Sequence, residues 1–468
     1  MGIRQAILIV IVLGLSLAGL VRARIGLYGY TWYALMRPDA LAWAGANPYS
    51  LVLAICTLLG SLIHVPARFQ VFFRNPLLVL LLLVQIPFLC SVLFAYQPAL
   101  CWDALDQYMR ALLMALLIPV LITTLDQLRI LFLIVACSLG LIGAKYGAAG
   151  LLHGGVRFAG GYAGMISDNN FLALALSMAI PLMWFGAQTV KPKWAKLALI
   201  GMVILNAAAI LMTYSRAGAV ALAAAFLLIA WRSRHRVVIL VALTLVTVPM
   251  ALMLGQAYID RLATLKAPTE EASALSRLVL AKAGLKLWAD HPWLGVGFGR
   301  QNQQLLLPRY MPEWWGGFQG FVIHNTWIQV LTDSGIFAFL LYVLLYLSCL
   351  WWLGRVFRRS RKDQSPWAPY AAGLHTSLAA FGVGATFGSR VDFDLYYILI
   401  ATVAALYEIR KNWIPAEEAA PAIPTLRPPQ ITHSLPVAAL LDGAARESKR
   451  VRPSRARQQA VTTEQKPG

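Results

Sequence analysis

Three basic side chains have the types and positions needed to recognise a phosphate group and activate a hydroxyl. Arg216 lies in a turn between two apolar runs, Arg277 opens a stretch of helical periodicity, and His324 directly precedes a long apolar run. Guanidinium groups match phosphate oxygens bidentately. The N-terminus of a helix attracts anions and favours a neutral imidazole, which can accept a proton from a hydroxyl. If the three residues share one face of a membrane, they predict a site for a phosphate-bearing lipid.

Each of these residues also has a purely structural interpretation. His324 could cap its helix at the membrane interface, and Arg277 alone would read as a solvated charge. Arg216 could reach lipid phosphates at the interface. An arginine in mid-membrane would cost about 2.5–3.5 kcal/mol, so we expect Arg216 at the interface or paired.

Polar residues near the same apolar runs could line a vestibule on the outer face. Asp168 or Asn169 could cap the helix that follows them, and Arg157 in the preceding glycine-rich loop could instead meet this acidic start. Asp392 and Asp394 resemble part of a metal-binding acidic triplet. Two carboxylates alone make a weak metal site, so we predict no metal.

A polar stripe follows His324 along the next apolar run. Asn325, Gln329 and Asp333 are four residues apart and lie on one helical face, which must contact protein or water. Asp333 lies about 180° around an ideal helix from His324. It is therefore expected to fix the helix against a neighbour rather than to orient the imidazole.

The composition places these residues in a membrane. Of 468 residues, 59% are hydrophobic and only 13% are charged, and the mean hydropathy is +0.66. One crossing of a bilayer takes about 20 helical residues. This composition excludes a soluble enzyme, a single-anchor receptor and a nucleic-acid-binding domain. In a membrane protein, a net charge of +20 first indicates which loops face the cytoplasm and contact membrane lipids. Five scattered cysteines without CxxC spacing argue against a disulfide framework.

The apolar runs predict an all-α, polytopic integral membrane protein with about twelve transmembrane helices. The runs are 6–21, 49–64, 76–95, 110–124, 128–149, 169–188, 197–213, 217–231, 237–255, 325–353, 366–386 and 394–409. The aromatic stretch 25–36 has basic flanks and reads as an interfacial or re-entrant segment. Basic clusters follow alternate helices, which predicts cytoplasmic termini. This orientation predicts four outer segments: 150–168, 213–217, the large loop 256–322 and 386–393.

The large loop is predicted to be ordered, and the chain divides into three regions. Within the loop, Leu278, Ala281, Leu285 and Trp288 lie near helical spacing in the stretch 276–289, and a turn-rich segment 291–299 follows. The regions are an N-terminal transmembrane region 1–190, a second transmembrane region 191–411 that contains the loop, and a basic tail 412–468. The tail lacks apolar periodicity, which predicts a disordered cytoplasmic segment resting on lipid headgroups.

Three stretches together are similar to the membrane region shared by O-antigen ligases and O-antigen polymerases. They are residues 213–218 (TYSRAG), residues 276–297, which end in DHPWLGVG, and His324-Asn325 followed by Asp333-Ser334-Gly335. Three further stretches, at 37–38, 166–176 and 389–390, resemble the O-glycosylation ligases associated with exosortase A systems. The likeness covers about residues 1–410 and makes 191–411 an O-antigen ligase-like region.

This resemblance implies a metal-independent glycosyltransferase without a cofactor, located in the bacterial inner membrane and serving cell-envelope or exopolysaccharide biogenesis. It would transfer a glycan from undecaprenyl diphosphate to an acceptor hydroxyl at the periplasmic face, with inversion at the anomeric carbon. Arg216 and Arg277 would bind the diphosphate, and His324 would activate the acceptor. The vestibule candidates are Arg157, Asp168, Asn169, Asn325 and Arg390.

The acceptor and the reaction class have alternatives. Protein or an exported polysaccharide is favoured over a lipid acceptor by the exosortase-associated likeness alone. An O-antigen polymerase would instead use a second lipid-linked chain as the acceptor. A transporter is a further alternative, although the sequence has no evident internal repeat and its distinctive polar residues gather at one face.

Overall fold

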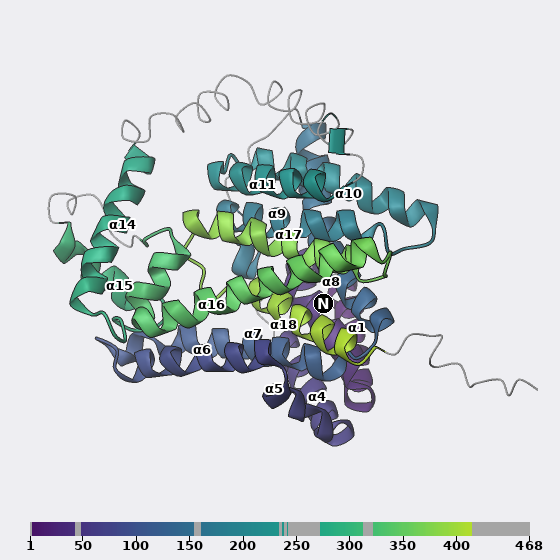
Figure 1. The fold of residues 1–468 in the computed structure, drawn as a ribbon, viewed down its shortest axis with the longest axis horizontal. Helices are drawn as coiled ribbons and strands as arrows, with labels where there is room; N and C mark the ends of the chain where they lie inside the picture. The colour runs from purple at the N-terminus through teal and green to yellow at the C-terminus, as the bar shows by residue number, and fades with distance from the viewer. Residues whose placement is uncertain are drawn as a thin grey trace, which may run out of the picture. The chain divides into compact units, whose positions relative to one another are not determined.

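The computed structural model describes residues 2–42, 48–153, 161–233, 236–237, 241, 272–311 and 322–413 (Figure 1). All regular elements in these ranges are helices, which confirms the predicted all-α class. Seven helices are long and apolar enough to cross a bilayer, and an eighth crossing results if Tyr49–His64 and the bent segment Pro66–Arg74 count as one. The chain is therefore a multi-pass membrane protein. The count of twelve stays a prediction, since most of the run 237–255 lies outside the described ranges. Residues 414–468 of the predicted disordered tail also lie outside them.

The first half of the chain supplies one group of helices. They are α1 (Ile3–Val21), α2 (Ala23–Met36), α3 (Pro38–Ala42), α4 (Tyr49–His64), α5 (Val71–Arg74), α6 (Pro76–Leu93), α7 (Trp102–Leu121), α8 (Leu125–Leu152) and α9 (Asn169–Gly186). The second half supplies α10 (Lys193–Met212), α11 (Arg216–Arg232), α14 (Ala272–Asp290), α15 (Gln301–Leu306), α16 (Thr326–Lys362), α17 (Ala368–Gly384) and α18 (Asp394–Lys411).

Helix α2 corresponds to the aromatic stretch with basic flanks, and it is packed inside the protein. It contacts α1, α4, α7 and α8. A Cβ on Gly26 would lie 2.8 Å from the Gly19 Cα and would also meet the Thr57 hydroxyl, so α1 and α2 approach closely and α4 packs against them. This burial argues against the predicted interfacial placement, and the re-entrant placement stays a prediction.

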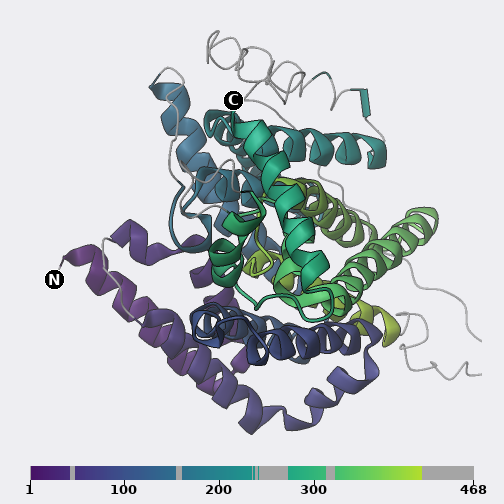
Figure 2. The ribbon, with the colours of Figure 1, turned by 90° about the vertical axis from the view of Figure 1, so that its left-hand side faces the viewer.

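Four helices that carry candidate residues run in the same direction. Helices α9, α11, α16 and α18 each begin near a candidate residue, and α11, α16 and α18 end in basic turns. Helix α17 packs against all four of them. Figure 1 shows α14 and α15 at one end of this bundle, and Figure 2 is turned so that this end faces the viewer. The basic turns therefore lie at the opposite helix ends from the candidate site.

A break in α16 shapes the same end of the bundle. Gly335 has φ 75° and ψ −175°, which interrupts the helix and frees backbone groups that must find partners inside a bilayer. The turn-rich segment 291–299 provides them. Three hydrogen bonds of 2.9 Å join it to α16: Val296 N–H to Thr332 O, Gly297 N–H to Asp333 O, and Ile336 N–H to Pro292 O. The described part of the large loop is thus attached to the helix that follows His324.

Helix α14 confirms the helix predicted at 276–289, but the leucines that showed its helical spacing are not on its packed face. Leu280 and Leu287 are buried, whereas Leu278 and Leu285 are 45% and 43% exposed. The buried face packs on residues of the loop itself: Val296, Leu306, Leu307, Met311 and Ile323. Because leucines occur on two faces of this helix, periodicity alone could not identify the packed one.

Candidate functional site

The starts of α9 and α11 are joined by side-chain hydrogen bonds. Asn169 Nδ2 donates to the Thr213 carbonyl at 3.0 Å, and the Ser215 hydroxyl donates to Asn170 Oδ1 at 2.7 Å. Ser215 also caps α11 by accepting from the Gly218 N–H. These bonds place the turn 213–215, and the Arg216 that follows it, beside the start of α9.

The start of α16 meets the segment that leads into α18. The Thr326 hydroxyl donates to the Gly388 carbonyl at 2.5 Å and accepts from the Arg390 N–H at 3.1 Å. The Arg390 guanidinium lies 4.1 Å above the centre of the Phe171 ring, in the first turn of α9. The predicted outer segments around residues 168, 213–217 and 386–393 therefore converge at one end of the bundle.

His324 lies at this meeting point and is not the cap of its helix. Asn325 is the N-cap, because its side chain accepts from the N–H groups of Trp327 and Ile328. His324 has a left-handed backbone with φ 54° and is partly buried. Burial, with a smaller contribution from the Arg277 charge, lowers the pKa of His324 to about 4, while the Asp168 charge acts in the opposite direction. Burial and the Arg277 charge thus favour the neutral imidazole that the sequence predicted.

The two arginines predicted to bind phosphate reach this end on different elements. Arg277 is in the second turn of α14, and its charge acts on His324. Arg216 is the first residue of α11 and is only 9% exposed. A buried guanidinium at the tip of a helix agrees with the expectation that Arg216 is paired or interfacial. The structure thus brings His324, Arg277 and Asp168 within electrostatic range, and it carries Arg216 to the same end.

Asp168 caps its helix, as its structural interpretation predicts, and its charge also acts on the candidate site. It is the N-cap of α9 and accepts from the N–H groups of Asn170 and Phe171 at 2.8 and 3.4 Å. Its negative charge also acts on His324 and Arg390. Arg157, the predicted partner of this acidic start, lies outside the described residues.

Arg300 and Asp392 belong to the same cluster, although the sequence did not point to Arg300. Asp392 Oδ2 lies 3.4 Å from Arg390 Nη1 and 3.7 Å from Arg300 Nη2, so this carboxylate balances two guanidinium groups. In the described chain, no three His, Cys, Asp or Glu side chains are grouped as metal ligands would be. Three buried polar atoms of the cluster, Ser389 Oγ, Arg390 Nε and Asp392 Oδ1, have no hydrogen-bond partner among the described residues. Such atoms suit a polar ligand or water.

The polar stripe on α16 faces protein, as predicted. Gln329 Nε2 donates to Asp333 Oδ2 at 3.0 Å, and Gln303 Nε2, from α15, donates to Asp333 Oδ1 at 3.1 Å. Gln329 Oε1 also accepts from the Val391 N–H at 3.3 Å. Asp333 therefore fixes the loop against α16, which agrees with the expected structural role and leaves His324 to be oriented by other contacts.

This arrangement can bind an anion next to a hydroxyl. Four helix starts bring partly positive N–H ends together, and arginines from α11, α14 and the segment before α18 lie at the same end of the bundle. A neutral imidazole in this setting can accept a proton, because burial and the Arg277 charge keep it from already holding one.

Two family models match parts of the chain. Residues 201–343 match the family model described as O-antigen ligase, and residues 3–190 match a family of unknown function (DUF5935). No curated protein matches the chain. The first match contains Arg216, Arg277 and His324, whereas Asp168 falls in the second and Arg390 in neither. Residues 201–343 of this multi-pass membrane protein are thus similar to the O-antigen ligase family, and this similarity supports a function of the ligase or polymerase type.

Proposed function

We propose that the protein is an inverting, metal-independent glycosyltransferase of the bacterial inner membrane, with its active site facing the periplasm. The donor is a glycan on undecaprenyl diphosphate, and the acceptor is a hydroxyl on protein or on an exported polysaccharide. The family match over residues 201–343 supports activity of the ligase or polymerase type, and the donor, the acceptor, the stereochemistry and the location are our inference. The observation that carries the proposal is the neutral His324 beside the positive charge of Arg277.

In this proposal, the residues act in a single displacement. His324 accepts the proton of the acceptor hydroxyl as the acceptor oxygen forms its bond to the anomeric carbon. The bond from that carbon to the diphosphate oxygen breaks, and its electron pair leaves with the diphosphate. Arg277 and Arg216 stabilise the charge that develops there, and attack opposite the leaving group inverts the carbon. The imidazolium then returns its proton to water.

In this proposal, Asp392 and the two arginines that it pairs with help to bind the sugar. Asp392 holds Arg390 and Arg300 through one carboxylate oxygen. The buried polar atoms of Ser389, Arg390 and Asp392 that lack partners are suited to hydroxyls of the bound sugar. The remaining vestibule candidates, Asn169 and Asn325, hold helix starts in place through their own hydrogen bonds.

The state of the lipid-linked glycan in cells that lack the protein tests the reaction class. For a ligase, we expect full-length chains to accumulate on undecaprenyl diphosphate while acceptor-linked glycan disappears. A polymerase would instead leave single repeat units on the carrier. Glycan pools that remain normal in both compartments would contradict both forms of the proposal and favour the transporter alternative.

The pH dependence of transfer should follow the pKa of His324. Two substitutions should shift this pKa in opposite directions. Because a protonated imidazole cannot act as a base, we expect the acidic limb of the rate profile near the His324 pKa of about 4. Arg277→Gln removes a positive charge, so it should raise this pKa and move the limb to higher pH. Asp168→Asn removes a negative charge and should move the limb to lower pH, while asparagine still caps α9.

Each limb is measured against that variant's own plateau, so a lower rate in Arg277→Gln does not obscure its position. The assay follows transfer from purified lipid-linked glycan over a range of pH. Limbs that move in the same direction, or that stay in place in both variants, would rule out His324 as the titrating base.

A further inference from the structure

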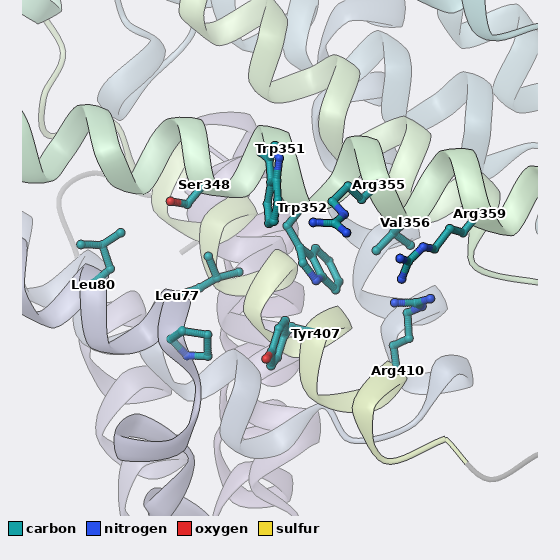
Figure 3. Close-up of a pocket in the computed structure, with 11 residues that line it drawn as sticks. Leu77, Leu80, Ser348, Trp351, Trp352, Arg355, Val356, Arg359, Tyr407 and Arg410 are labelled. Atoms are coloured by element: carbon teal, nitrogen blue, oxygen red, sulfur yellow. The ribbon is translucent and has the colours of Figure 1, made fainter.

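A cavity at the basic end of the bundle has the composition of a lipid-phosphate site. It has a volume of about 490 Å³ and lies between α6, α16 and α18 (Figure 3). Arg355 and Arg359 enter it from the end of α16, and Arg410 enters it from the end of α18. Its apolar walls include Leu77 and Leu80 of α6.

Among the described residues, no carboxylate balances the charges in this cavity. Within the chain segments that the structure covers, no carboxylate lines the cavity and none of its three arginines forms an ion pair. By contrast, the exposed Arg110 and the half-buried Arg129 each pair with an aspartate on their own helix. Three guanidinium groups directed at one hollow repel one another unless an anion lies between them. The cavity is therefore complementary to a phosphate group.

Aromatic side chains shape the cavity and are typical of the headgroup level of a bilayer. The Arg355 guanidinium lies 4.5 Å above the Trp351 ring, which leaves its N–H edges free to face the hollow. Trp352 packs against Tyr407 with ring centres 5.4 Å apart. Figure 3 shows both tryptophans and Tyr407 beside the arginines. Tryptophan and tyrosine gather where the hydrocarbon region meets water.

An apolar stripe leads from this cavity toward the middle of the membrane. Leu340, Leu344, Leu347 and Trp351 recur at helical spacing on one face of α16 and are 56%, 52%, 53% and 61% exposed. Trp351 belongs both to this stripe and to the wall of the cavity. A free phosphate ion would use only the arginines, whereas a lipid would use the arginines and the stripe together.

We infer that this cavity binds the phosphodiester headgroup of an anionic phospholipid, whose acyl chain lies along the exposed stripe of α16. The site is at the opposite end of α16 from His324, so it is separate from the proposed active site. The inference does not rest on the proposed function. It needs only the bilayer around the helices.

Titration of the purified full-length protein with lipids, followed by native mass spectrometry, tests this inference. The wild-type protein should bind phosphatidylglycerol in preference to zwitterionic phosphatidylethanolamine. Each arginine near a membrane surface contributes about a factor of five to anionic lipid binding. The combined change Arg355→Gln, Arg359→Gln and Arg410→Gln should therefore weaken phosphatidylglycerol binding on the order of 100-fold. Arg359→Gln alone should weaken it about fivefold, which provides a second measurement if the combined variant folds poorly.

The matched control changes three basic residues at the same helix ends that do not line the cavity: Arg358→Gln, Lys362→Gln and Lys411→Gln. It alters the net charge equally and should retain the lipid. Leu344→Asn should weaken phosphatidylglycerol binding without affecting inorganic phosphate. Equal losses in the two charge variants would overturn the inference, as would displacement of the lipid by millimolar inorganic phosphate, which would indicate a free-anion site.

Discussion

His324→Ala, at wild-type protein level, is expected to abolish acceptor-linked glycan and to cause lipid-linked glycan to accumulate. A positioned general base contributes about 10²–10⁴-fold to a rate. The structure makes His324 suited to this role because burial and the Arg277 charge keep its imidazole neutral. The measurement compares glycan on undecaprenyl diphosphate with glycan on acceptors, first in cells and then with purified protein.

His291→Ala is the matched control for this experiment. His291 is a histidine in the large loop that precedes His324, but it is exposed, and its backbone groups make the turn with Trp288 and Gly295. Removal of its imidazole should therefore leave transfer near the wild-type rate. Normal transfer in His324→Ala would remove the base from the proposed mechanism. An equal loss in both variants would point to general damage to the loop.

Gly335→Ala is expected to have the largest effect on stability. The φ of 75° and ψ of −175° at this position are accessible almost only to glycine. A Cβ would also lie 2.0 Å from the carbonyl oxygen of Trp293, which is backbone and cannot turn aside. The strain and the displaced backbone together should cost about 3 kcal/mol or more. The temperature of unfolding of the purified protein, followed by loss of the monodisperse species, provides the measurement.

Gly201→Ala is the control for this substitution. Gly201 lies inside α10, and a Cβ there would meet nothing within 4 Å. Alanine is the better helix former, so this change should be neutral or slightly stabilising. If Gly335→Ala unfolded at the wild-type temperature, the break in α16 could not be what fixes the segment 291–299.

A loss of stability at Gly335 should also affect the site. The break exposes the backbone groups that hold residues 292–297, and this loop continues into Gln303, which bonds to Asp333. Displacement of the loop would move α14 and Arg277 relative to His324, since α14 packs on the same loop residues. We therefore expect Gly335→Ala to lower transfer even at temperatures where the protein remains folded.

The amino-acid sequence by itself determined the membrane class, the all-α architecture and the residues that could act on a phosphate and a hydroxyl. These follow from properties that each segment carries alone: the apolar runs and the cost of placing Arg216 in hydrocarbon. The cap at Asp168 was also predictable, since capping is decided within one turn. The orientation and the number of crossings stay predictions.

The tertiary structure alone decided which of these residues meet. The bonds from α9 to α11 and from α16 to Gly388 and Arg390 join segments that are far apart in the chain. The pairing of Asp392 with Arg300 has no local signal, because neither residue differs in type from an ordinary surface charge. The packed face of α14 and the break at Gly335 were likewise set by partners elsewhere in the chain. Local patterns fix which side chains a segment carries, whereas burial and charge at His324 depend on which helix ends the packing brings together.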